Sequence, residues 1–177
     1  MDLAILRLGL YVFLLLLSLI LFSLSAARLQ YTLHLPPGDP LNKGVNFYDP
    51  AIIELLVASL FSLGWCIFII YLYFRTTGNP IIRTYREELV VLGILWLLLL
   101  GGSAAASNIW AVVAFCQQFQ ACQILSAVLG ICWTAFVVLT AIIGVDVKLI
   151  RDHGGLNVPL ARSRSLKESL GREGSEV

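Results

Sequence analysis

The stretch from Leu89 to Val145 constrains this chain more than any other feature, because its 57 residues include no Asp, Glu, Lys, Arg or His. About a quarter of the residues of an ordinary soluble domain are charged, so such a long uncharged run does not occur there. In the whole chain, charged residues make up 13% and hydrophobic residues 59%. The sequence therefore predicts a small integral membrane protein.

Four apolar stretches are long enough to cross a bilayer, whose hydrocarbon core of about 30 Å needs about 20 helical residues. They are predicted at residues 8–27, 55–74, 89–115 and 124–145. Asp49 and Pro50 are typical of a helix start and precede the second stretch. The first stretch exceeds the apolar core of a signal peptide, so we expect it to remain as a span. The predicted fold is all-α, a four-helix transmembrane bundle over residues 1–153 with a mobile tail over 154–177.

The distribution of Lys and Arg predicts the orientation of the spans. Ten of these residues are predicted on one side of the membrane: Arg7, three in the loop between the second and third stretches, and six after the fourth stretch. Two lie in the loop between the first and second stretches, on the other side. By the positive-inside rule, both termini are cytosolic. The aromatic residues near the predicted span ends agree: Tyr11, Tyr71, Tyr73 and Tyr85 on the inner side, and Tyr31, Tyr48 and Trp110 on the outer side.

Charged side chains are predicted to lie outside the spans or at their edges. Glu54 and Asp146 come nearest to the apolar interior, and we interpret both as solvated charges at helix ends. A pump, a proton relay or a voltage sensor is not expected, since these need charges inside the membrane. His34 and His153 lie on opposite sides of the predicted membrane and cannot share a metal ion. The sequence predicts no enzyme, cofactor or metal site, and no dense basic face for nucleic acid.

The four cysteines form two pairs in this topology. Cys66 and Cys132 lie within spans, where small apolar packing is the simplest role. Cys116 and Cys122 flank a polar break between the third and fourth spans, which we interpret as a short outer hairpin turn. A chain that reverses there can bring their Cα atoms close enough for a disulfide. The alternative is two free thiols at the membrane surface.

Small residues at four-residue spacing predict faces where helices approach closely. One set lies on the third span and the other on the fourth: Gly101, Gly102, Ser103, Ala105, Ala106 and Ser107, and then Ser126 and Gly130. Packing within one bundle is the favoured interpretation, because four spans must first pack with each other. Contact between protomers is the alternative.

Three tryptophans lie inside the spans: Trp65, Trp96 and Trp133. Such rings usually fill gaps between helices, and the alternative is that they line a groove for a sterol or an acyl chain. Two segments also fit a weak cholesterol-contact pattern, one through Arg7, Tyr11 and Leu14 and the other through Arg83, Tyr85 and Leu89.

The chain resembles the MARVEL-domain family, in particular its small fungal-type members. Besides the four-span layout and the Cys116/Cys122 pair, three segments carry the resemblance: Tyr48-Asp-Pro-Ala-Ile-Ile-Glu54, Thr84-Tyr-Arg-Glu-Glu-Leu89 and Ala106-Ser-Asn-Ile-Trp110. It covers about residues 5–150. Claudins and tetraspanins fit less well, because their loop signatures are missing. The resemblance implies a role in organising membranes, including vesicle traffic and sterol-rich domains.

Two functions follow as hypotheses. The first is a non-catalytic protein of the plasma membrane or the secretory pathway that organises membrane domains or vesicle traffic through helix packing and lipid association, with sterol among the candidate lipids. The second is an accessory subunit of a channel, transporter or membrane-enzyme complex, docking through Gly101 to Ser107. The small-residue faces also allow a homo-oligomer.

Overall fold

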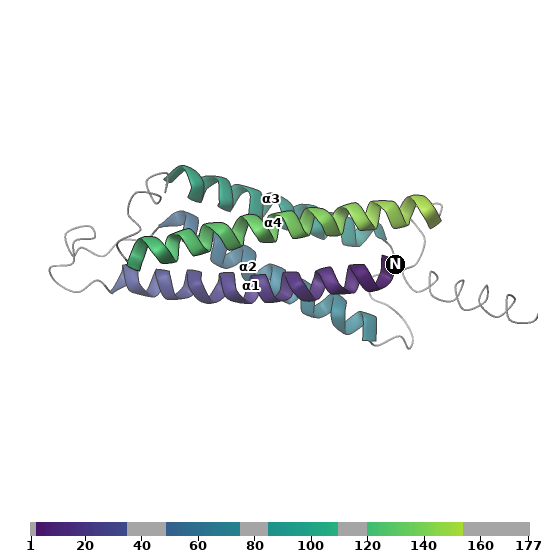
Figure 1. Cartoon of the computed structure of the whole chain (residues 1–177), viewed down its shortest axis with the longest axis horizontal. Helices are drawn as coiled ribbons and strands as arrows, with labels where there is room; N and C mark the ends of the chain where they lie inside the picture. The colour runs from purple at the N-terminus through teal and green to yellow at the C-terminus, as the bar shows by residue number, and fades with distance from the viewer. Residues whose placement is uncertain (1–2, 35–48, 75–84, 110–119, 154–177) are drawn as a thin grey trace, which may run out of the picture.

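The computed structural model describes residues 3–34, 49–74, 85–109 and 120–153, and these form four helices (Figure 1). The helices are α1 (Leu3–Leu33), α2 (Pro50–Phe74), α3 (Tyr85–Ile109) and α4 (Gln120–His153). Each contains a segment long and apolar enough to cross a membrane. For the described residues, the predictions of an all-helical fold and of four such helices are confirmed.

The four helices lie side by side as a bundle, with their main contacts arranged in a ring. α1 packs against α2 and α4, and α3 packs against the same two helices from the opposite side. Figure 1 shows the start of α1 and the end of α4 at one end of the bundle, and α2 crossing behind α1 at an angle. Helices adjacent in the sequence are therefore neighbours in space, as in bundles whose connections are short.

The start of α2 forms as the sequence predicts. The carboxylate of Asp49 accepts a hydrogen bond of 3.1 Å from the backbone N–H of Ala51, and Pro50 is the first helical residue. Here the side chain satisfies a backbone donor that has no partner within the helix.

Two other boundaries differ from the sequence-based expectation or lie outside the described residues. α4 begins at Gln120, so Cys122 and Gln123 belong to the helix and not to the expected hairpin turn. The described part of α3 ends at Ile109. The rest of the third predicted span, to residue 115, and the predicted tail from residue 154 lie outside the described residues.

The buried residues of α4 follow a regular spacing of three and four. This spacing keeps one stripe of a helix facing its neighbours over many turns, as in coiled coils and most membrane bundles. The stripe consists of Leu125, Val128, Cys132, Ala135, Leu139, Ile142, Asp146 and Leu149. An acidic residue therefore occupies a position of the seam that is otherwise filled by apolar and small side chains.

α1 has the same spacing, and every second position of its stripe carries a hydroxyl group. Tyr11, Ser18, Ser25 and Thr32 recur every seven residues, and all four are buried. Ser18 donates a hydrogen bond of 2.8 Å to Ser62 of α2, which joins the two helices at mid-length. Small hydroxyl residues let membrane helices approach closely and bond to each other.

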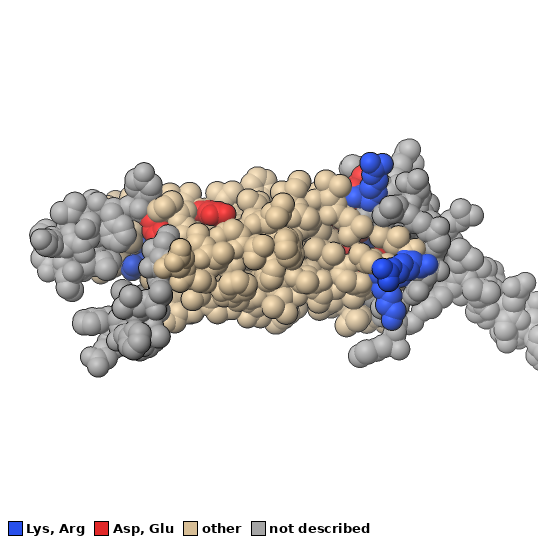
Figure 2. All heavy atoms as spheres, turned by 90° about the horizontal axis from the view of Figure 1, so that it is seen from above, with Lys and Arg blue, Asp and Glu red and all other residues tan. Residues whose placement is uncertain are grey.

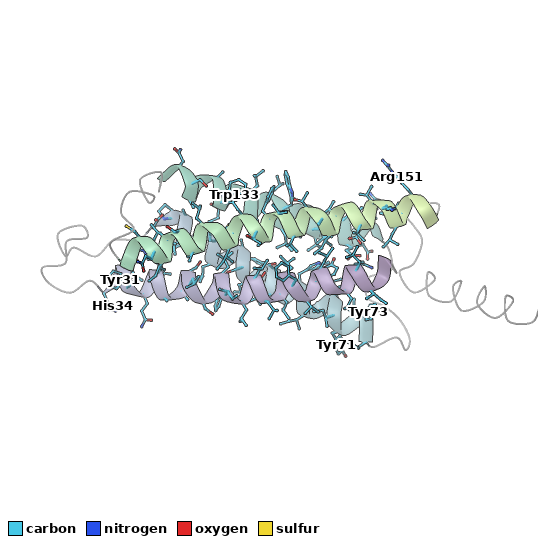
Figure 3. All side chains as sticks on the ribbon, in the orientation of Figure 1. Tyr31, His34, Tyr71, Tyr73, Trp133 and Arg151 are labelled. Carbon is cyan, nitrogen blue, oxygen red and sulfur yellow. The ribbon has the colours of Figure 1, made fainter. Side chains whose placement is uncertain are left out.

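The outer surface of the bundle is apolar along its middle. Most of the middle of the face in Figure 2 is uncharged, with one acidic patch left of the centre, and most of the visible Lys and Arg lie at the right-hand end of the bundle. Figure 3 shows Tyr31 and His34 at the opposite end, and Tyr71, Tyr73 and Arg151 at the basic end. These tyrosines lie near the ends of the bundle, where the sequence predicts them.

Candidate functional site: a buried charge cluster

Near the basic end, three helices contribute charged groups to the interior of the bundle. We call Arg7 and Tyr11 of α1, Glu88 of α3 and Asp146 of α4 the charge cluster. The Arg7 guanidinium forms an ion pair with Glu88, and its Nε lies 2.9 Å from Oδ1 of Asp146. The Tyr11 hydroxyl donates a hydrogen bond to Oε1 of Glu88. Both carboxylate side chains are 0% exposed and that of Arg7 is 16% exposed, so the cluster lies inside the protein.

The prediction that Asp146 is a solvated charge at a helix end is therefore wrong. Asp146 follows Ile142 by four residues and precedes Leu149 by three, so the seam of α4 turns it inward. Glu88 likewise stands four residues before Leu92 on the buried stripe of α3. The three-and-four spacing is the sequence signal that identifies these residues as buried. Their distance from the nearest polar segment does not identify them.

The cluster contains two carboxylates and one guanidinium. Burying a charge is costly unless it is paired, because the surroundings cannot replace its hydration. Arg7 serves both acids and also lies over the ring of Tyr11, with 5.7 Å from Cζ to the ring centroid. Among the described residues, neither oxygen of Asp146 has a hydrogen-bond partner, so its contact with Arg7 is an ion pair without hydrogen-bond geometry.

The arrangement ties α1 to α3 and α4 at one end of the bundle. α1 and α3 lie on opposite sides of the bundle, because the main contacts of each are with α2 and α4. The hydrogen bonds of Arg7 and Tyr11 with Glu88 connect α1 and α3 directly. Among the described residues, no group of three or more His, Cys, Asp or Glu side chains could hold a metal ion. The geometry therefore supports a structural lock more directly than a metal centre.

The burial of this region also excludes one predicted lipid contact. Tyr11 is 1% exposed and Leu14 is 0% exposed, so neither side chain reaches the lipid-facing surface. The cholesterol-contact pattern through Arg7, Tyr11 and Leu14 is wrong for this reason, and Tyr11 belongs to the core and not to an interfacial belt. Arg83 of the second pattern lies outside the described residues.

At the other end, the small residues of α3 pack against α2. A Cβ atom on Gly102 would lie 2.7 Å from Cδ2 of Leu55, and one on Gly101 would lie 2.9 Å from Oε1 of Glu54. At the buried Gly102 the approach of α2 leaves no room for a side chain, whereas at the exposed Gly101 the flexible carboxylate of Glu54 can move aside. Glu54 is half-buried beside this contact.

The other members of the small-residue faces have different surroundings. Ser103 and Ala106 are fully buried in the bundle, and Ala105 is partly buried. Ser107 accepts a hydrogen bond of 3.1 Å from Nε1 of Trp133, which connects α3 to α4. On α4, Ser126 bonds to the backbone of its own helix, and a Cβ on Gly130 would meet no atom within 4 Å. Among the described members of these faces, Gly102 is the position where a side chain has least room.

An apolar groove of about 500 Å³ lies between α2 and α3 on the side of the bundle. We call it the lateral groove; it is lined by Leu60, Phe61, Gly64, Trp65, Phe68, Val91, Ile94, Leu95 and Leu98. Of the three tryptophans, only Trp65 lines it. Trp96 and Trp133 instead pack against Phe136 of α4, with ring centroids 5.2 and 5.7 Å apart.

The cysteines are only partly covered by the described residues. Cys66 and Cys132 are free, and both are buried in the bundle as packing residues. Cys122 lies in α4, and Cys116 lies outside the described residues. The bridge between Cys116 and Cys122 stays a prediction.

Comparison with known proteins gives no identification, since no family model, curated protein or solved structure matches this chain. The resemblance to MARVEL-domain proteins accordingly stays a prediction from the sequence.

Proposed function

We propose that this chain is a non-catalytic, multi-pass membrane protein that organises membrane domains or vesicle traffic through helix packing and lipid association. The lateral groove is the observation that carries the proposal. It is apolar, lies on the outer side of two candidate membrane spans and is open to the surroundings of the bundle. In a bilayer, those surroundings are lipid tails.

In this proposal, the end that holds the charge cluster faces the cytosol. The exposed cations Arg86, Lys148 and Arg151 belong to this end, where α3 begins and α4 ends. Cytosolic ends of membrane helices carry an excess of such residues. Both termini are then cytosolic, and the protein belongs to the plasma membrane or the secretory pathway.

The charge cluster has a supporting role in this function. It fixes α1 against α3 and α4 at the cytosolic end, while the Gly101–Gly102 contact fixes α3 against α2 at the other. A bundle held at both ends keeps its lipid-facing side in one shape. The resemblance to MARVEL-domain proteins points to the same kind of membrane-organising role.

Reconstitution tests the proposal. The full chain is placed in nanodiscs with and without sterol, released in the mass spectrometer, and the lipids that remain bound are identified. We expect a defined lipid to remain, in an amount that exceeds its share of the nanodisc. Loss of all lipids without preference would contradict lipid association as the function.

The accessory-subunit hypothesis has less support. Its docking face runs from Gly101 to Ser107, and three members of that face, Gly102, Ser103 and Ala106, are already buried inside the bundle. Crosslinking from the exposed neighbours Ala104 and Asn108 in native membranes would favour this alternative if it captured one dominant heterologous membrane protein.

A further inference from the structure

The charge cluster contains one more negative charge than positive charge. Glu88 and Asp146 are both 0% exposed, and Arg7 is the one cation that pairs with them among the described residues. Tyr11, the fourth member, is a phenol and is neutral at physiological pH. A charge buried without a counterion is costly, because the protein interior cannot replace its hydration. The cluster therefore lacks one positive charge.

The two carboxylates differ in their contacts. Glu88 accepts hydrogen bonds from Arg7 and Tyr11. Asp146 forms an ion pair with Arg7, and neither of its oxygens accepts a hydrogen bond from a described residue. Buried carboxylate oxygens without a donor are rare and costly. The missing positive charge is thus needed beside Asp146.

The guanidinium of Arg7 brings the two acids together. Its Nε lies 2.9 Å from Oδ1 of Asp146, and its Nη2 bonds to both oxygens of Glu88. Nε and Nη2 are attached to the same carbon atom, so the two carboxyl groups are neighbours. Two neighbouring carboxylates repel each other, and such a pair binds a proton that belongs to both. One proton also brings the net charge of the cluster to zero.

The other titratable residues near this end do not supply the missing charge. α4 packs against α1 and α3, and both helices reach Asp146 through members of the charge cluster. The tyrosines at this end of α2, Tyr71 and Tyr73, are uncharged at physiological pH. The other charged residues of α3 and α4 whose exposure is described at this end are exposed: Arg86, Glu87, Lys148 and Arg151.

The position of the cluster gives protons a route from one side. Arg7, Glu88 and Asp146 each stand next to a predicted span, namely residues 8–27, 89–115 and 124–145. All three adjoin these spans at the end that faces the cytosol in the proposed function. The side chain of Arg7 is 16% exposed, so the cluster reaches the surface of the bundle there. The proton is therefore exchanged with the cytosolic side.

We propose that the charge cluster is a proton-binding site, in which Glu88 and Asp146 hold one proton taken up from the cytosolic side. The protonated cluster is neutral and holds the ends of α1, α3 and α4 together. Loss of the proton leaves one uncompensated charge between these helices, so a rise in pH loosens this end of the bundle. The inference goes beyond the proposed function and relies on it only for the orientation of this end.

The pH dependence of unfolding tests the site. The folding equilibrium constant of the full chain in mixed detergent micelles is measured from about pH 5, where the carboxyl groups of the unfolded chain are largely ionised, to about pH 8. It is divided by that of Asp146→Asn, whose amide mimics a neutral acid. The folded chain binds one proton more than the unfolded chain, so we expect this ratio to fall up to tenfold for each unit of rising pH. The fall ends where the folded cluster releases its proton.

Glu87→Gln is the matched control. It removes an exposed carboxylate beside Glu88 in the same turn of α3. We expect the folding equilibrium constant of this variant to fall with pH as steeply as that of the unmodified chain.

Infrared spectroscopy detects the proton directly and does not depend on unfolding. We expect the folded, unmodified chain at neutral pH to show the carbonyl stretch of a protonated carboxyl group. This band should weaken as the pH rises and should be reduced in Asp146→Asn and in Glu88→Gln, but not in Glu87→Gln.

Three results would overturn the inference: a ratio that stays constant from about pH 5 to pH 8, the absence of the infrared band, or a band that both cluster variants leave unchanged. Stabilisation by sodium chloride but not by choline chloride at equal ionic strength would assign the missing charge to a metal cation and would also overturn it. The proposed function has a separate readout. If a defined lipid remains bound in the mass spectrometer while no proton is detected, the proton site is wrong and lipid association stands.

Discussion

Arg7→Gln is expected to destabilise the bundle far more than the loss of any exposed cation. At 2.9 Å and an effective dielectric constant of about 20, the attraction between Arg7 and Asp146 amounts to about 6 kcal/mol, and Glu88 adds a second pair. Desolvation of the three groups offsets much of this attraction. Removing the guanidinium leaves two buried carboxylates without a cation, so we expect the free energy of unfolding to fall by about 3 to 5 kcal/mol.

The measurement is reversible unfolding of the full chain in mixed detergent micelles, followed by far-ultraviolet circular dichroism. Lys148→Gln is the matched control, because it removes the same charge from an exposed position at the same end and is expected to change the free energy of unfolding by less than about 0.5 kcal/mol. Equal effects of the two substitutions would refute the reasoning, since they would mean that the charge cluster behaves as a solvated surface pair.

Two further variants identify the origin of the loss. Asp146→Asn leaves Arg7 with one carboxylate, Glu88, so we expect a smaller effect than that of Arg7→Gln. Replacing Arg7, Glu88 and Asp146 together by Met, Met and Leu removes all charges and is expected to restore most of the stability, or to exceed that of the unmodified chain by about 1 to 4 kcal/mol. A triple variant as unstable as Arg7→Gln would assign the loss to packing and not to uncompensated charge.

Three other expectations test the packing of the bundle. Gly102→Ala should lower the free energy of unfolding by about 1 to 3 kcal/mol in the same assay, because its Cβ would lie 2.7 Å from Leu55; an unchanged value would mean that α2 and α3 are not in close contact. Ser62→Ala removes the hydrogen bond of 2.8 Å to α1 and should cost about 0.6 kcal/mol, with no loss at all counting against that bond. The thiols of Cys66 and Cys132 are buried, so their alkylation in micelles should be slow until the bundle unfolds. Rapid modification of the folded chain would show that these thiols are accessible.

The four helices could be predicted from the sequence because membrane insertion depends on a sum over consecutive residues. About 20 consecutive apolar residues are enough for a helix to cross the bilayer, whatever the rest of the chain does. The uncharged run from Leu89 to Val145 therefore predicts membrane spans by itself. The start of α2 is predictable for a similar reason, since Asp49 bonds to the backbone only two residues away. Such features need no information about distant parts of the chain.

The partners of the charged groups depend on tertiary structure. Arg7 and Asp146 are separated by most of the sequence, and Asp146 lies close to a polar segment, so its local surroundings suggest a solvated charge. Only the packing of α1, α3 and α4 turns the three charges toward each other. The spacing of three and four residues reveals which face of α4 is buried, but it does not reveal which residues of the neighbouring helices lie opposite.

The lateral groove is the feature least visible in the sequence. Apolar residues on α2 and α3 are equally compatible with tight packing and with an open space, because hydrophobicity measures transfer from water and not the fit between two surfaces. Tertiary packing decides where that space lies: α2 and α3 are in close contact at Leu55 and Gly102, and they leave a space along residues 60–68 and 91–98. The sequence by itself determined that the chain forms four apolar helices with charges near their ends. Tertiary structure decided which charges are buried together and where the side of the bundle is open, because both depend on the relative positions of helices that are far apart in the chain.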